Sequence, residues 1–441
     1  MGKKFVLLGA GSYVFTRNLV RDILTYPAFQ DATFALVDIN PDGLAFSVKA
    51  VNRIIEAGKY PAKVIATCDR REVLPGADGV LSMLMAQPLN IFRHDLEICE
   101  KYGVSINVGD TRNPAGIFRF LRTVPVMLDI LKDVKELCPG AVFLNYTNPM
   151  AMLCRAMQEE APEMTITGLC HSVQGTVEKF AGILGIPFEE ISYTCAGINH
   201  MAYYLKLEHN GEDLYPALRK ATLEKQDVYE ADIVRNEMFL ATGYYVTESS
   251  GHFSEYSPWF RKRKDLLEKY CCRGTSWNTG RPNFTITFRE ERARKFDEEL
   301  AAFLREPVDL ERGNEYASRI FNAIFGDHEM YKFNGNVRNF GLIDNLPYGA
   351  CVEVPVLASR NGLEPMHVGP IPDAVLPLVS LSSQIEEMAV KASFSGDPEL
   401  IYKAMIYDPL ASAVLDLREI RKMTDELFAF SKPYLPQFKG L

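Results

Sequence analysis

The chain of 441 residues carries a formal net charge of −9, with 47% hydrophobic and 24% charged residues. This length predicts two domains, or one large α/β domain with an elaborated second half. The acidic balance argues against binding to nucleic acid or to an anionic membrane surface. The apolar stretch from Phe5 to Ala10 is too short for a signal sequence, and no run reaches the ~18 apolar residues of a membrane span. Nine cysteines, an odd number, fit reduced thiols better than a disulfide framework. We therefore expect a cytoplasmic protein that acts on a small molecule.

Strand-like and helix-like segments alternate in the first half of the chain. The apolar run at residues 4–9 ends in glycines and leads into a pattern of helical spacing. Further buried strands are predicted at residues 32–40, 79–84 and 141–147. This alternation predicts an α/β fold with a doubly wound, Rossmann-type parallel sheet.

The alternation is lost from about residue 195 onward. Residues 203–218 suggest a hairpin, and long helical patterns follow around residues 285–330 and 375–431. We therefore predict a dinucleotide-binding domain at residues 1–195. Residues 196–441 are predicted to form a mixed α/β, helix-rich domain for substrate, metal and self-association.

A glycine turn joins the first predicted strand to the following helix. It consists of Gly9, Ala10, Gly11 and Ser12. Glycines here let the backbone approach a pyrophosphate, whose charge the helix N-terminus favours. Asp38 ends the second strand, where an acid binds ribose hydroxyls and repels a 2′-phosphate. Val14 replaces the third glycine of the usual motif, so a plain tight turn with a capping acid is the alternative. The pattern predicts NAD rather than NADP.

Four later segments each end or follow an apolar, strand-like run. They are residues 109–111, 145–150, 168–173 and 196–204. In a doubly wound sheet, strand ends and their loops meet at one crevice beside the cofactor. Cys170 and His200 lie in two of these segments, and a thiolate with an imidazole binds first-row divalent metals. A buried core cysteine is the alternative interpretation of Cys170.

Seven segments resemble glycoside hydrolase family 4, the NAD- and manganese-dependent group. They are "GAGSYVF", "NYTNPMAM", "GLCHSVQGT", "AGINHMAYYL", "TESSGHFSEYSPWF", "NVRNFGLIDNLPYGACVEVP" and "DPLASAVL". The resemblance extends from residue 4 to about residue 420. It implies a sheet domain similar to that of lactate and malate dehydrogenases. The Cys-His-Ser-Val form resembles the melibiase-type α-galactosidases, whereas branches that act on 6-phosphosugars carry other residues after the cysteine.

The resemblance implies hydrolysis by elimination and addition. The sugar is oxidised at C3 by hydride transfer to NAD⁺, which makes the C2 proton acidic. A base removes that proton, the glycosidic oxygen leaves with the help of an acid, water adds, and hydride returns to C3. A divalent metal on the C2 and C3 oxygens stabilises the negative charge that develops in the transition state.

The resemblance also implies roles for individual residues. Cys170 and His200 are the implied Mn²⁺ ligands, and Asn148 is implied to bind sugar hydroxyls near the nicotinamide. His171 matches the position assigned to the acid for the leaving group, and its near-neutral pKa suits that work. Asp110 is the rival acid, or a contact of the substrate or of the metal's water. The alternatives are a turn-capping role for Asn148 and a supporting hydrogen bond for His171.

The base for the C2 proton is a tyrosine in family members that act on phosphosugars. The stretch "GYYVTESSGHFSEY" offers Tyr244, Tyr245, His252 and Tyr256. A nearby metal would lower the pKa of a phenol from its normal ~10. Tyr244 and Tyr245 are our candidate bases and His252 our candidate substrate-binding residue. His252 and Glu255 at i, i+3 are also a candidate pair that orients the sugar.

One loop departs from the family pattern. Members usually show Asp-Thr-x-Gly-Pro-Gly-Gly, whereas this chain has Asp-Thr-Arg-Asn-Pro-Ala-Gly at residues 110–116. Asn113 and Ala115 replace glycines that permit close backbone approach, and Arg112 adds a positive charge. The departure favours either a narrower pocket or an acidic sugar.

The sequence therefore predicts an NAD- and Mn²⁺-dependent α-galactosidase. Within the family the alternatives are an α-glucosidase and a uronic-acid glycosidase, either an α-glucuronidase or an α-galacturonidase. Outside the family the alternatives are an NAD-dependent sugar or 2-hydroxy-acid dehydrogenase and a non-catalytic NAD-binding sensor. Dimers or tetramers are usual in the resembling family, so we expect a homodimer or homotetramer.

Overall fold

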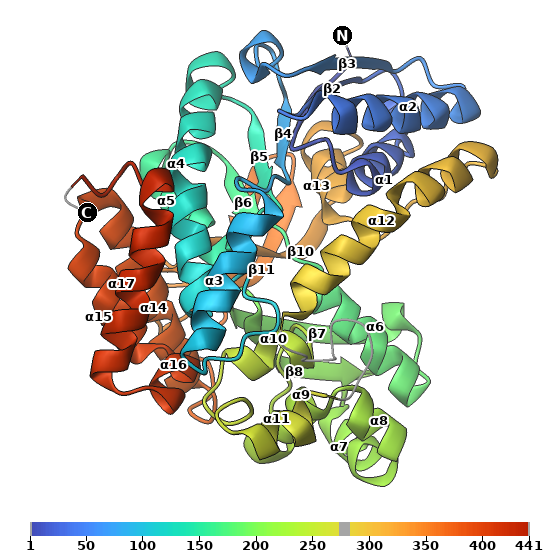
Figure 1. Ribbon diagram of the computed structural model, residues 1–441. Coiled ribbons are helices and arrows are strands. Elements are labelled where there is room, and N and C mark those ends of the chain that lie inside the picture. Colours follow the sequence, from blue (N-terminus) through green and yellow to red (C-terminus); the bar gives the residue numbers. More distant parts are fainter. Residues whose placement is uncertain (1, 273–282, 440–441) are drawn as a thin grey trace.

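One mixed sheet runs through both halves of the chain (Figure 1). The computed structural model describes residues 2–272 and 283–439. Over these residues the strand order is β3-β2-β1-β4-β5-β6-β10-β11-β7-β8-β9, with β12 beside β11. The first six strands in this order pair in parallel. Their order is that of a doubly wound dinucleotide-binding sheet, so the predicted fold class is confirmed.

The predicted strands correspond to β1, β2, β4 and β5 of the parallel part. That part contains β1 (Lys4–Leu8), β2 (Thr33–Val37), β3 (Lys63–Thr67), β4 (Gly79–Ser82), β5 (Val142–Asn145) and β6 (Ile166–Gly168). The antiparallel part contains β7 (Ile191–Ile198), β8 (Met201–His209), β9 (Glu212–Asp213), β10 (Tyr331–Arg338), β11 (Cys351–Ser359) and β12 (Gly362–Pro365). The strand β3 is short and largely exposed, and it was not among the predicted strands.

Helices cover both faces of the parallel sheet. On the side of the dinucleotide turn lie α1 (Tyr13–Leu24), α2 (Pro41–Gly58), α12 (Phe284–Arg305) and α13 (Tyr316–Phe325). The other side carries α3 (Leu89–Lys101), α4 (Asn113–Leu137) and α5 (Met150–Glu160). In β1, Val6 and Leu8 join the core of this second side, whereas Phe5 and Leu7 join the core of the first. Alternation across a strand thus supplies two hydrophobic cores.

The remaining helices form two groups at the lower and left parts of Figure 1. Below the sheet lie α6 (Ser172–Leu184), α7 (Tyr215–Glu224), α8 (Gln226–Ala231), α9 (Ile233–Thr242), α10 (Ser250–Glu255) and α11 (Lys264–Tyr270). At the left lie α14 (Leu376–Ser395), α15 (Pro398–Tyr407), α16 (Pro409–Val414) and α17 (Leu417–Ser431). Among the helices of the described ranges, none is long and apolar enough to cross a bilayer.

The predicted boundary at residue 195 falls inside β7, and the sheet is continuous across it. Gly168 of β6 pairs with Asn336 of β10, Asn336 pairs with Glu353 of β11, and Glu353 pairs with Gly197 of β7. All three pairings are antiparallel. The strands β6 and β7 therefore approach this row from opposite directions, and each ends at it. The segments that follow them carry Cys170 and His200.

A buried ion pair joins the C-terminal helices to the second side of the sheet. The guanidinium of Arg122, on α4, faces both carboxylate oxygens of Asp95, on α3, and one of these contacts measures 3.0 Å. The same guanidinium donates to Ser431 of α17 at 2.8 Å. Burial raises the pKa of Asp95 to about 6, although Arg122 opposes this shift.

Removal of Asp95 should therefore leave the positive charge of Arg122 buried without a partner carboxylate. We expect Asp95→Ala to lower the free energy of unfolding by about 3–5 kcal/mol, because Arg122 would stay buried without its countercharge. Urea denaturation measures this loss. The exposed neighbour on the same helix supplies the control, Glu97→Ala, which should change stability little. Equal losses in both variants would contradict the assignment.

Candidate active site

The dinucleotide turn is shaped by two close backbone approaches. Gly9 has φ +84°, and a Cβ there would lie 2.7 Å from the Cα of Leu84. The amide of Gly11 donates to Asp38 Oδ2 at 2.7 Å, and a Cβ on Gly11 would meet the same oxygen at 2.7 Å. Position 9 therefore requires glycine, and a side chain at Gly11 would displace the carboxylate of Asp38. Ala10 points into the core instead, with no exposed surface.

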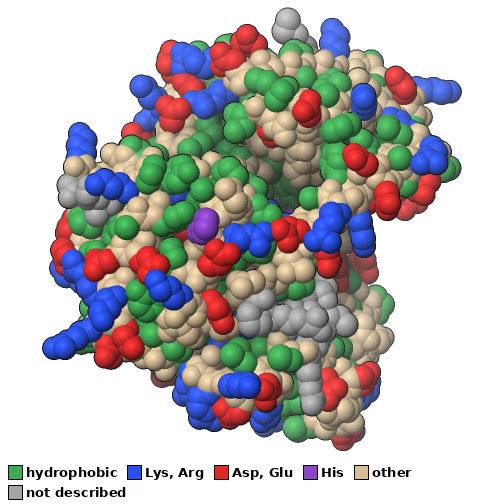
Figure 2. Space-filling model, viewed as in Figure 1, with side chains coloured by type: hydrophobic (Ala, Val, Ile, Leu, Met, Phe, Trp, Pro, Cys, Tyr) green, Lys and Arg blue, Asp and Glu red, His purple; other side chains and the backbone are tan. Residues whose placement is uncertain are grey.

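A large cavity of about 1270 Å³ connects this turn with the later segments. Figure 2 shows the face hollowed below the N-terminal part of the sheet. The cofactor side of the cavity is lined by Gly9, Gly11, Ser12 and Asp38. The opposite side is lined by Asp110, Asn148, Cys170, His171, His200, Glu248 and His252. The predicted cofactor turn and metal pair therefore share one open cavity.

Three side chains in this cavity form a potential metal-binding group. Cys170 Sγ, one ring nitrogen of His200 and one carboxylate oxygen of Glu248 all lie within 4.8 Å of one another. Cys170 follows β6, His200 occupies the turn between β7 and β8, and Glu248 precedes α10. Thiolate, imidazole and carboxylate together are a donor set that fits a divalent first-row metal. Burial raises the pKa of the Cys170 thiol well above its usual value, so its deprotonation needs a cation.

Hydrogen bonds fix the orientation of His200. The Thr111 hydroxyl donates to Asp110 Oδ1 at 2.8 Å, so Thr111 Oγ1 accepts from His200 Nδ1, which lies 3.1 Å away. The other nitrogen, Nε2, lies 3.5 Å from Glu248 Oε2. Burial lowers the pKa of His200 to about 4, so the ring is neutral. A neutral imidazole held through Nδ1 presents Nε2 as a metal ligand.

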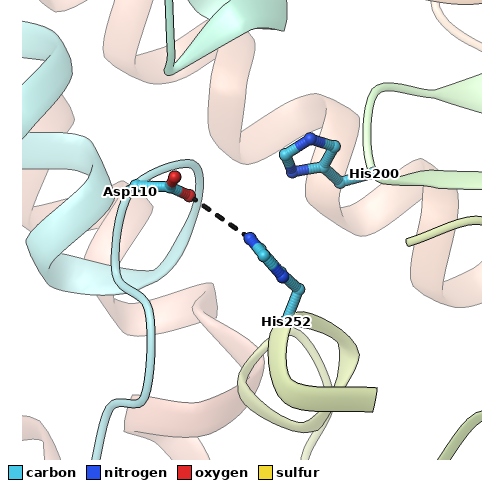
Figure 3. Close-up of side chains that lie close together, drawn as sticks. All are labelled: Asp110, His200 and His252. Atoms are coloured by element: carbon cyan, nitrogen blue, oxygen red, sulfur yellow. Dashed lines mark ion pairs between the residues drawn. The ribbon is translucent and has the colours of Figure 1, made fainter. Parts of the chain in front are cut away.

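His252 and Asp110 carry opposite charges beside this group. Figure 3 shows His252 pointing towards Asp110, with Nε2 and Oδ1 separated by 3.7 Å. The other ring nitrogen of His252 lies 3.2 Å from Glu248 Oε1 and 2.8 Å from Ser249 Oγ. Burial opposes the charge of His252, but Glu248 and Asp110 outweigh it and raise its pKa to about 9. Burial likewise opposes the charge of Asp110, and His252 outweighs it and holds the pKa of Asp110 well below its usual range.

His171 lies at the cavity rim, directly before α6. Its Nε2 is 2.7 Å from Glu315 Oε2, and its ring stacks on Tyr146 at 6.0 Å. Burial would lower the pKa of His171, but the bond to Glu315 and the charge of that carboxylate outweigh burial and raise it. The two residues before Glu315 are anchored, since Gly313 N donates to Asp22 and the side chain of Asn314 donates to Glu178. His171 is therefore held in a form that can donate a proton.

Asn148 also faces the cavity. Its side-chain oxygen is buried and has no hydrogen-bond partner among the residues that the structure describes. Such an unpaired acceptor in a polar cavity fits a hydroxyl group of a bound molecule. This placement supports the sugar-binding role predicted for Asn148.

The two candidate tyrosine bases lie away from the cavity. The hydroxyl of Tyr245 donates to Asn236 Oδ1 at 3.0 Å, and its ring packs edge-on against Phe180 in a hydrophobic core. Tyr244 packs edge-on against Tyr215. Neither tyrosine lines the cavity that holds Cys170 and His200. The prediction that one of them acts as base is therefore wrong for this structure, because both rings turn towards the helices below β8.

The expectations for three other residues of this region, Tyr256, Arg112 and Glu255, also need correction. Tyr256 is buried beside Arg112 in a separate small cavity. Arg112 forms an ion pair with Glu386 of α14 at 2.8 Å, so its charge is neutralised away from the main cavity. Glu255 accepts three backbone N–H groups, those of residues 107–109, and holds the loop before Asp110 rather than a sugar. Asn113 takes φ +65°, the left-handed conformation that the family's glycine would supply.

Glu248, Thr111 and Glu315 complete the site but are not among the predicted site residues. Glu248 stands four residues before His252, a spacing that a search for carboxylate–imidazole pairs would have found. Thr111 follows Asp110 in a segment that the sequence does single out. Glu315 carries no such signal, because 144 residues separate it from His171.

Comparisons with known proteins identify relatives of the whole chain. The pattern of the family 4 glycosyl hydrolases matches residues 4–186, and that of their C-terminal domain matches residues 195–411. The chain is 37% identical to an α-galactosidase of Rhizobium meliloti over 99% of this chain and 89% of that protein. It is 36% identical to an α-galactosidase of Bacillus subtilis over 99% of this chain and 100% of that protein.

A solved structure shares the whole fold. It is a 6-phospho-α-glucosidase from gut microorganisms in complex with NAD and Mn²⁺, with 20% identity and a TM-score of 0.83 over 100% of both chains. At this identity the likeness concerns the fold. The two matched patterns together with the similarity to the α-galactosidases show that the chain belongs to family 4 of the glycosyl hydrolases.

Proposed function

We propose that this protein hydrolyses an α-galactoside by the NAD- and Mn²⁺-dependent route of its family. The observation that carries the proposal is the union of two sites in one cavity. The glycine turn with Asp38 lines one side, and the group of Cys170, His200 and Glu248 lines the other. A simple dehydrogenase has no need of the second group. The α-galactosidase relatives support galactose as the sugar.

Residues of the chain can be assigned to both bound groups. Gly9, Gly11 and Asp38 would hold NAD, and Cys170 with His200 would hold the metal. When bound, the two groups supply a hydride acceptor for C3 and a Lewis acid for the C2 and C3 oxygens. Asn148, with its unpaired buried oxygen, would orient the sugar by accepting from one of its hydroxyls.

Two residues are suited to opposite proton transfers. His171 keeps a proton because Glu315 stabilises its charged form, so we assign it to donate that proton to the glycosidic oxygen. Asp110 is ionised beside His252, so it has no proton to donate and can only accept one. We assign Asp110 to the C2 proton. Environments that push neighbouring pKa values apart are a common basis for such a division.

An α-galacturonoside is the second candidate substrate. Arg119 and Arg289 line the main cavity, and both interact with the charge of Asp110. The Nε of Arg289 is buried and unpaired within the described part of the chain. Arginine recognises carboxylates through several N–H groups. These two residues, and not Arg112, are therefore the observation that favours an acidic sugar.

The compartment and the number of subunits stay predictions. An acidic chain with unpaired cysteines favours the cytoplasm, and the family resemblance favours a homodimer or a homotetramer.

A panel of nitrophenyl glycosides tests the substrate. With NAD⁺, Mn²⁺ and a reductant, we expect the α-galactoside to react faster than the α-glucoside and the α-galacturonide, without net formation of NADH. Omission of either NAD⁺ or Mn²⁺ should abolish release of nitrophenol. Preference for the α-galacturonide, lost at least tenfold in Arg289→Met, would instead establish the second candidate. Net NADH without nitrophenol would contradict both, since it indicates a dehydrogenase.

Hydrolysis in D₂O tests the route of reaction. We expect deuterium at C2 of the released sugar, because the proton removed from C2 exchanges with solvent before another returns. Asp110→Asn should slow hydrolysis by about 10²–10⁴-fold, the usual contribution of a proton-transferring group. The exposed Asp129→Asn is the matched control and should react like the wild type. Unlabelled product would point to hydrolysis by two carboxylates.

Cys170→Ser tests the metal group. We expect loss of Mn²⁺-stimulated activity by more than about 100-fold, because the thiolate ligand is lost. Binding of NAD, followed by fluorescence, should persist, since Gly9, Gly11 and Asp38 lie on the other side of the cavity. The exposed Cys272→Ser is the control. Full Mn²⁺ stimulation in Cys170→Ser would remove the cysteine from the metal site.

A further inference from the structure

Glu248 lies beside Cys170 and His200, the two implied metal ligands, which leave other coordination positions of the ion unfilled. We propose that Glu248 is a third protein ligand of the divalent metal, beside Cys170 and His200. The inference rests on the proposed function only in that the protein binds such a metal. Neither the identity of the sugar nor the order of the proton transfers affects it.

The distances fit one shared ion. Ligand atoms that each lie about 2.0–2.3 Å from an ion are roughly 3–4.5 Å apart from one another. Glu248 Oε2 lies 3.5 Å from His200 Nε2, and all three ligand atoms of the group lie within 4.8 Å. His200 Nε2 faces Glu248, because the other ring nitrogen, Nδ1, is hydrogen-bonded to Thr111. The carboxylate and the imidazole therefore present their free atoms to the same point.

The backbone holds Glu248 at the level of His200. Val246 forms an antiparallel bridge with Tyr203, and the amide of Thr247 donates to the carbonyl of Ala202 at 2.8 Å. This pairing continues towards the start of β8, where His200 precedes Met201. The next residue after Thr247 is Glu248. It is therefore fixed to the strand that carries the histidine ligand.

The conformation of Glu248 is also unusual. Its φ is +70°, in the left-handed region that residues other than glycine rarely adopt. His200, the other ligand at this turn, has φ +60°. Strained backbone of this kind persists where the surroundings hold it and clusters at functional sites. Both conformations direct a side chain into the cavity, where the two meet.

A carboxylate also suits the metal. Thiolate and imidazole alone favour zinc or copper, whereas carboxylate oxygens suit manganese and magnesium. The negative charges of a Cys170 thiolate and of Glu248 together balance a divalent cation. His252 does not need Glu248 as its only acceptor, because Ser249 Oγ lies closer to the same nitrogen, at 2.8 Å against 3.2 Å. Glu248 can therefore turn to a metal without leaving His252 unpaired.

Titration of the metal-free full-length protein with Mn²⁺ tests the proposal. The electron paramagnetic resonance signal of free Mn²⁺ gives the Kd without any activity assay. We expect Glu248→Gln to weaken Mn²⁺ binding at least tenfold and Zn²⁺ binding less, because an amide is a poorer ligand for the harder ion. The matched control is Glu315→Gln, which removes a carboxylate beside His171 but outside the metal-binding group. Its Kd for Mn²⁺ should stay within twofold of the wild-type value.

The outcomes separate a ligand from a general effect of charge. A wild-type Kd in Glu248→Gln, or equal weakening in both variants, would overturn the proposal, as would a wild-type protein that binds no Mn²⁺. If Glu248→Gln does not fold, a crystal of the wild-type protein soaked in Mn²⁺ decides. A carboxylate oxygen of Glu248 about 2.0–2.3 Å from the anomalous peak supports ligation, and one beyond about 3 Å overturns it. Normal Mn²⁺ binding without glycoside hydrolysis would refute the proposed function and leave this inference standing.

Discussion

The site depends on two strands that end at the same row of one sheet. Gly168 of β6 and Gly197 of β7 lie at the two ends of this row, with Asn336 and Glu353 between them. Because β6 and β7 both end at this row, the segments that leave them start from the same level of the sheet. One segment brings Cys170 and the other brings His200.

Burial and neighbouring charges set the protonation of the titratable groups around the site. Glu353 is fully buried. Burial raises its pKa to about 7. Burial keeps His200 neutral, whereas the carboxylates of Glu248 and Asp110 keep His252 charged. Two histidines whose rings lie 5.2 Å apart thus differ in charge, which suits one to bind a metal and the other to donate hydrogen bonds.

The parallel sheet and its glycine turn were predictable because their signals are local. Short apolar runs mark β1, β2, β4 and β5, and Gly9, Gly11 and Asp38 stand at fixed offsets from them. Cys170 and His200 were predictable as a pair of metal-binding residue types that follow strand-like runs. The close approach of these two residues was not predictable. It depends on β10 and β11, which lie more than 130 residues further along the chain. Register between such distant strands leaves no trace in the residues near the site.

The wrong prediction for Tyr244 and Tyr245 also has its cause in a contact between residues that are distant in the sequence. Nine residues span the segment that contains Tyr244, Tyr245, Glu248 and His252. The sequence alone therefore does not distinguish which of these side chains reach the site. The bridge between Val246 and Tyr203 divides the segment. Residues before it turn towards the helices below β8, whereas residues after it turn into the cavity. A single backbone pairing thus decides which side chains reach the metal group, and it places a carboxylate there where the sequence suggested a phenol.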